Sequence, residues 1–250
     1  MIKKLTNYLF KSIKILKLGD VLGPKDVENE RQFHRHNVLD FAVGRVRVLD
    51  KFFPIWSLSW GGVSLRCDDT SFNHLLNKDL PLIMDIEILG EVYRFNVQLV
   101  SLQLNQVGFQ FIHLSKEQEN FLKNYLTYLD AGLILKSVKK LGFDEQYQDP
   151  EWYIYGGHDG AVYVFLRFGA NYVLKEAHVL FDYGIKKEMV IYSSSGIAVK
   201  SSTKEELSRD KKLRSLTRAS LILLGMRQIA NSEHFDAVLK SAISTIVKRK

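Results

Sequence analysis

Two short polar clusters contain the residues whose types and spacing could bind a ligand. Arg31 and Arg35 are four residues apart, and Ser57, Ser59 and Gly62 follow about 20 residues later. Arginine presents a planar fork of donors that fits phosphate oxygens and the O6/N7 edge of guanine. Serine hydroxyls can donate to or accept from a base or ribose, and glycine allows close approach of the backbone. The two clusters are therefore candidate ligand-binding residues.

The order of these clusters, with a strand-like segment between them, resembles the PilZ domain family, whose pattern is R-x-x-x-R, a strand, and [D/N]-x-S-x-x-G. Arg31 and Arg35 fill the first part, and Ser59 and Gly62 fill the Ser and Gly of the second. Ser57 stands where the family prefers Asp or Asn, which is a departure from the pattern.

The resemblance covers roughly residues 30–130 and implies a receptor for cyclic di-GMP. Such a receptor would change conformation on binding and signal through its C-terminal domain or an unknown protein partner. The resemblance also makes residues 18–36 a candidate switch segment. We expect His34, His36 and Trp60 at the rim of the pocket, with a simple surface position as the alternative for the two histidines. The alternative function is a degenerate PilZ interaction module without nucleotide, which the serine at position 57 slightly favours.

Short apolar-rich segments separated by turn residues predict an antiparallel barrel in the first half of the chain. Gly90 marks a hairpin between two of these segments. Ser115 is a predicted N-cap for a helix that runs through Tyr128. The expected strands are 38–49, 55–59, 63–67, 81–88, 91–104 and 107–113.

Residues 131–250 predict a separate α+β domain, a β-meander with long helices, of unknown role. The expected strands, about four in number, are 152–155, 161–168, 172–181 and 187–192, and turn residues separate them. The expected helices are 133–141, a long helix starting at Thr203, and 235–247. The predicted fold class is thus mainly β with α: a PilZ-like antiparallel β-barrel over residues 31–130, then this domain.

Residues 1–17 form an amphipathic pattern, with one apolar face and lysines on the opposite side. We favour a helix that docks on the protein or on a second subunit, which would give a homo-oligomer. The alternative is a helix on an anionic membrane surface. Residues 18–30 read as a polar linker, so 1–30 forms the first region of the chain.

Composition and charge limit the classes of function. The 250 residues carry a net charge of +7, which favours an anionic partner. The single Cys67 suits a reducing compartment, so we expect a cytoplasmic protein. The sequence contains no run of 18 apolar residues, so we expect no membrane-spanning helix. It also contains no metal-ligand spacing and no catalytic motif, so we expect no metal, no cofactor and no enzymatic activity. The basic run 209–218 is interpreted as a solvated face rather than a nucleic-acid site.

Overall fold

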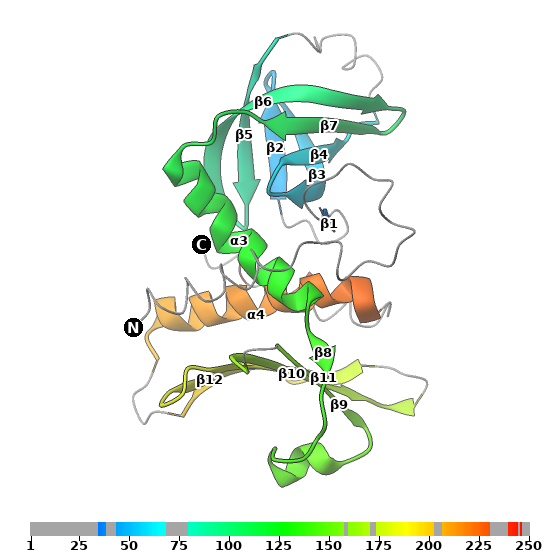
Figure 1. Cartoon of the computed structure of the whole chain (residues 1–250), viewed down its shortest axis with the longest axis vertical. Helices are drawn as coiled ribbons and strands as arrows, with labels where there is room; N and C mark the ends of the chain where they lie inside the picture. The colour runs from blue at the N-terminus through cyan, green and yellow to red at the C-terminus, as the bar shows by residue number, and fades with distance from the viewer. Residues whose placement is uncertain are drawn as a thin grey trace. The chain divides into compact units, whose positions relative to one another are not determined.

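Two antiparallel sheets and two long helices make up the described part of the chain (Figure 1). All of it belongs to one compact unit, residues 35–250. The computed structural model describes residues 35–38, 44–68, 80–157, 160–170, 174–202, 207–230, 240–244 and 246.

The first sheet closes into a six-stranded antiparallel barrel, which confirms the predicted fold class. Its strands run in the order β3-β2-β5-β6-β7-β4, and β4 pairs back with β3. The short β1 adds to the outside edge of β3. The strands are β1 (His36–Asn37), β2 (Gly44–Val48), β3 (Lys51–Ser59), β4 (Gly62–Arg66), β5 (Leu82–Ile88), β6 (Glu91–Gln103) and β7 (Gln106–Phe111).

Alternating apolar residues fill the barrel interior, as the period-two pattern of a strand requires. Met84 and Ile86 of β5 and Phe95 of β6 are completely buried. The predicted hairpin lies between β5 and β6, where Leu89 and Gly90 both have positive φ angles, of 48° and 84°. Each predicted strand of this half has a counterpart, with its ends shifted by one or two residues, except that β3 begins four residues earlier than predicted. Of the first predicted strand, residues 44–48 form β2, Val38 is not strand, and residues 39–43 lie outside the described part.

Helix α3 (Lys116–Leu133) follows the barrel and begins at the predicted cap. The Ser115 hydroxyl accepts from the Gln118 amide, and the Gln118 side chain accepts from the Ser115 amide, which forms a capping box. The helix continues past Tyr128 to Leu133. The predicted helix over 133–141 is wrong, because the chain leaves α3 at Ile134 and enters a strand that pairs with the second sheet.

The second sheet is an open antiparallel meander of six strands, in the order β13-β12-β11-β10-β9-β8. The four predicted strands are confirmed where described, and the sequence missed the two edge strands, β8 and β13. A short 3-10 helix, η3 (Glu145–Gln148), precedes β9. The strands are β8 (Lys136–Ser137), β9 (Trp152–Gly156), β10 (Val162–Phe168), β11 (Leu174–Asp182), β12 (Lys187–Ser193) and β13 (Gly196–Ser201).

Helix α4 (Arg209–Ala230) starts later than predicted. Leu207 and Ser208 are not helical, and the Ser208 hydroxyl accepts a hydrogen bond from the Lys211 amide at 3.4 Å. The predicted start at Thr203 is therefore wrong, because a serine closer to the helix provides the N-terminal acceptor.

Apolar packing is continuous between the two sheets. One cluster of buried side chains includes Phe109 of the barrel, Leu126 of α3 and Val179 of the second sheet. The domain division at residues 130 and 131 stays a prediction. The predicted 1–17 helix, the linker over 18–30 and residues 235–239 of the last predicted helix lie outside the described residues. Residues 240–244 and 246 are helical. In the described ranges, no helix is long and apolar enough to cross a membrane.

Candidate functional site

The pairing of β1 with β3 brings the arginine segment next to the serine segment. His36 lies opposite Leu58, Asn37 lies opposite Ser57, and the Val38 amide donates to the Trp56 carbonyl at 3.0 Å. Extending this register by one residue puts Arg35 level with Ser59. Residues more than 20 positions apart in sequence are therefore neighbours at one edge of the barrel. Arg31 and His34 lie outside the described part of the chain.

The hairpin between β3 and β4 carries the S-x-x-G residues. Ser59 pairs with Gly62 across a turn formed by Trp60 and Gly61, and the Ser59 hydroxyl donates to the Gly62 carbonyl at 3.2 Å. A Cβ atom at position 62 would collide with the Phe109 carbonyl of β7. Glycine is therefore required here for the close pairing of β4 with β7 that helps to close the barrel.

Ser57, the residue that departs from the family pattern, is buried and has a hydrogen-bond partner in the next strand. Its hydroxyl lies 2.7 Å from the Ser64 hydroxyl, which also accepts from the Gln106 amide nitrogen at 3.0 Å. The serine is 6% exposed. A hydroxyl in this place reaches a shorter distance than Asp or Asn would and is already engaged within the barrel.

Asp130 of α3 holds both predicted rim residues that the structure describes. His36 Nε2 donates to Asp130 Oδ1 at 2.7 Å, and Trp60 Nε1 donates to Asp130 Oδ2 at 2.9 Å. His36 is only 1% exposed, so the surface alternative for this histidine is wrong. Sequence reasoning missed Asp130, because it lies 94 positions from His36 and has no recognisable spacing to either cluster.

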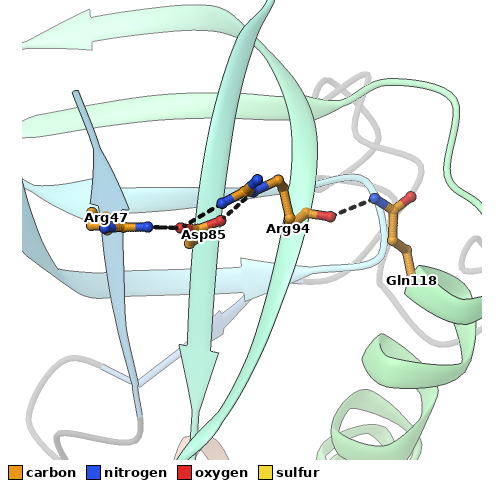
Figure 2. A network of polar contacts seen from close by, with 4 residues as sticks. All are labelled: Arg47, Asp85, Arg94 and Gln118. Carbon is orange, nitrogen blue, oxygen red and sulfur yellow. Dashed lines mark hydrogen bonds and ion pairs between the residues drawn. The ribbon is translucent and has the colours of Figure 1, made fainter. Parts of the chain in front are cut away.

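A second polar network lies on the outside of the barrel and connects three strands to α3 (Figure 2). Asp85 accepts from Arg94 Nε at 2.8 Å and also pairs with Arg47. The Gln118 side chain, part of the capping box, donates to the Arg94 carbonyl. The hydrogen bond from Arg94, and next that from Arg47, lowers the pKa of Asp85 below its usual value. A shallow hollow lies beside this network, lined by Arg47, Leu49, Asp50, Ile83, Asp85 and Arg94.

The second sheet contains a buried hydrogen-bonded chain that uses no residue of the predicted site. His178 Nε2 donates to Glu176 Oε1 at 2.7 Å, and the Tyr147 hydroxyl lies 2.7 Å from His178 Nδ1. Burial lowers the pKa of His178, although Glu176 opposes the shift. A neutral imidazole fits these contacts, since one nitrogen then donates to the carboxylate and the other accepts from tyrosine. Burial also raises the pKa of Tyr147, so its proton stays in place.

Three further residues that could have served a surface site are buried in the core: Cys67, Phe165 and Phe181. Arg218, from the basic run, lies over the Tyr128 ring at 5.6 Å. Among the residues that the structure describes, no group of three or more His, Cys, Asp or Glu could hold a metal ion.

The described architecture is a closed antiparallel barrel followed by helix α3 and a second, open sheet. No protein-family model matches the sequence, and no curated protein matches it significantly. An uncharacterized Legionella protein is structurally similar at a TM-score of 0.30 and 13% identity, over 39% of this chain and 94% of that chain. The PlzA protein of Borreliella burgdorferi, solved in complex with c-di-GMP, is similar at a TM-score of 0.27 and 14% identity, over 75% and 88%. These low scores carry no argument about function.

Proposed function

We propose that this protein is a receptor for cyclic di-GMP that changes conformation on binding and signals through its C-terminal half or a protein partner. The observation that carries the proposal is the register of β1 on β3, which brings Arg35 level with Ser59. An arginine whose backbone lies level with a serine, next to a closely packed glycine, supports a ligand that combines phosphates with guanines. We propose Arg31, Arg35, Ser57, Ser59 and Gly62 as the binding residues.

Titration calorimetry with the full chain tests this function. We expect saturable binding of cyclic di-GMP, with GTP as the matched control that supplies guanine and phosphate without the cyclic geometry. Binding of neither nucleotide would overturn the proposal. Equal binding of both would reduce it to a general guanine-nucleotide site.

A protein-interaction module without nucleotide is the second candidate. The observation that favours it is the bond between the Ser57 and Ser64 hydroxyls, which uses the position where the family pattern has Asp or Asn. The titration of the unaltered chain separates the two candidates, because only the receptor binds cyclic di-GMP. Ser57→Asp then shows what position 57 faces: affinity rises if its partner is a guanine N–H edge and falls if its partner is a phosphate.

The cellular setting and the output follow the same proposal. The sequence has a single cysteine, which suits a reducing compartment, and we propose the cytoplasm. A receptor of this kind performs no chemistry on its ligand and needs neither a metal nor a cofactor.

A further inference from the structure

The last turn of α3 contacts both segments of the proposed site through one side chain. Asp130 accepts from His36, which follows Arg35 in the chain, and from Trp60, which lies between Ser59 and Gly62. The His36 side chain is 2% exposed and that of Asp130 is 19% exposed. A carboxylate has two oxygens, and here each oxygen serves a different segment. Asp130 therefore fixes the two segments relative to each other and to α3.

The same turn of α3 presses directly on α4. A Cβ atom at Gly132 would collide with the Ile222 carbonyl, and one at Gly225 would collide with the Leu129 carbonyl. The two helix backbones are thus in contact at their crossing, with no side chain between them. Packed backbones of this kind transmit small displacements, because no flexible side chain is available to absorb them. A shift of Asp130 therefore reaches α4 through Gly132, which follows Asp130 by two residues in α3 and touches the α4 backbone.

Helix α4 in turn is hydrogen-bonded to the second sheet. The Tyr192 hydroxyl of β12 lies 3.0 Å from the Ser220 hydroxyl, and Ser215 donates to Glu188 at 2.7 Å. Tyr192 and Ser220 are both buried. A continuous series of polar and backbone contacts therefore runs from the β3–β4 hairpin through α3 and α4 to β12.

We propose that Asp130 is a positioning residue of the nucleotide site that couples this site to the crossing of α3 and α4. The inference rests on the proposed function for the identity of the ligand, but the coupling itself can be measured without ligand. Coupling between two sites is reciprocal in binding free energy. A change at the helix crossing must therefore alter the nucleotide site, and it must do so only while Asp130 is present.

Amide hydrogen exchange of the ligand-free full chain tests the coupling. Gly225→Ala forces the two helices apart, and the reporters are the amides of Val38 and Phe111, which bond to Trp56 and Gly61, and the Trp60 indole N–H. We expect their exchange to rise by about tenfold, the loss expected for one bond to a charged group. In the Asp130→Ala background we expect Gly225→Ala to add less than about twofold, because the connection is already absent. Equal effects in both backgrounds would overturn the proposal.

Controls separate coupling from a general loss of stability. The amides of the Met84 and Phe95 pair report opening of the whole barrel, and the reporter rates are taken relative to theirs. Glu119→Gln removes an acidic charge from an exposed position of α3, and it should leave the reporters unchanged. Gly132→Ala perturbs the same crossing from α3, since its Cβ would meet the Ile222 carbonyl, and it takes the place of Gly225→Ala if that variant does not fold. Asp130→Asn retains one acceptor oxygen, so it should partly restore the coupling.

Cyclic di-GMP titrations extend the test to the ligand. They compare the unaltered chain, Gly225→Ala, Asp130→Ala and the variant that carries both substitutions. We expect Gly225→Ala to weaken binding by about tenfold in the natural background and by less than about twofold with Asp130→Ala. Effects that multiply independently would mean that Asp130 acts only locally. If the unaltered chain binds no cyclic di-GMP, the proposed function fails, and the exchange measurement alone decides the coupling.

Discussion

The two sheets of this protein bury their apolar side chains in different ways. The barrel closes on itself, so its own side chains fill the interior, and the short β1 pairs with β3 (Figure 1). The second sheet is open and has two apolar faces to cover. Residues such as Val190 belong to the large cluster shared with α4, while Tyr147 of η3 and Phe165 form a small core on the other face.

This difference determines where polar residues can act. In the barrel, serine and glycine gather at the seam where β3 meets β4. In the second sheet, Tyr147, His178 and Glu176 bond to one another beneath the η3 segment. We infer that the barrel seam is suited to a ligand, whereas the polar chain of the second sheet serves stability.

The largest expected effect comes from removing one buried aromatic ring from each region. Phe109→Ala in the barrel and Phe165→Ala in the second sheet should each lower the free energy of unfolding by about 3–5 kcal/mol, because both rings are fully buried. Since α3 and α4 share one apolar cluster, we expect a single thermal transition in calorimetry that both variants shift. Two transitions, each sensitive to one variant, would instead support the predicted division at residues 130 and 131.

The second prediction concerns the ligand binding that we propose for the barrel. Arg35→Ala should weaken cyclic di-GMP binding by about ten- to a hundredfold, since a hydrogen bond to a charged group contributes about 1.5–3 kcal/mol. Arg31→Lys should also weaken it, because lysine keeps the charge but loses the fork. Calorimetry measures both, and Arg66→Ala, an exposed arginine on β4 paired with Asp68, is the control. Unchanged affinity in both site variants would move the site elsewhere.

The third prediction tests the structural role of the polar chain in the second sheet. Burial holds the pKa of His178 below its usual value of 6.5, so the unfolded chain binds its proton first. The free energy of unfolding should therefore fall as the pH drops from about 7 through the lowered pKa, by at most about 1.4 kcal/mol per pH unit from this group. Urea denaturation between pH 7 and 5 measures the slope. His178→Gln should flatten it, and an unchanged slope would contradict the assignment.

The smallest effect is expected on the outer face of the barrel. The arginine bonds lower the pKa of Asp85, so its stabilising contribution is complete above the usual value of 3.8 and is lost as the pH falls through the lowered value. Asp85→Asn should slightly reduce the thermal midpoint at pH 7. The loss should shrink from 0.1 to 1 M salt, where the screening length falls from about 10 to about 3 Å. A loss independent of salt would indicate packing rather than charge.

The sequence by itself determined the local features of this protein. Apolar alternation and turn residues predicted most of the barrel strands, Gly90 predicted a hairpin, and Ser115 predicted the start of α3, because each depends on neighbours within a few residues. Local signals failed for residues 133–141, because residues 136 and 137 pair with β9 at the edge of the second sheet and form β8. They also failed at the start of α4, which begins at Arg209 after the non-helical Leu207 and Ser208.

Only the tertiary structure decided which polar residues meet. The sequence proposed the arginine and serine clusters, but their proximity depends on the register of β1 with β3, which hydrogen bonds between distant segments determine. Asp130 could not be found at all from spacing, since its partners His36 and Trp60 lie 94 and 70 positions away. Contacts over such separations depend on how strands close and helices cross, and a linear pattern of residue types contains no record of that geometry.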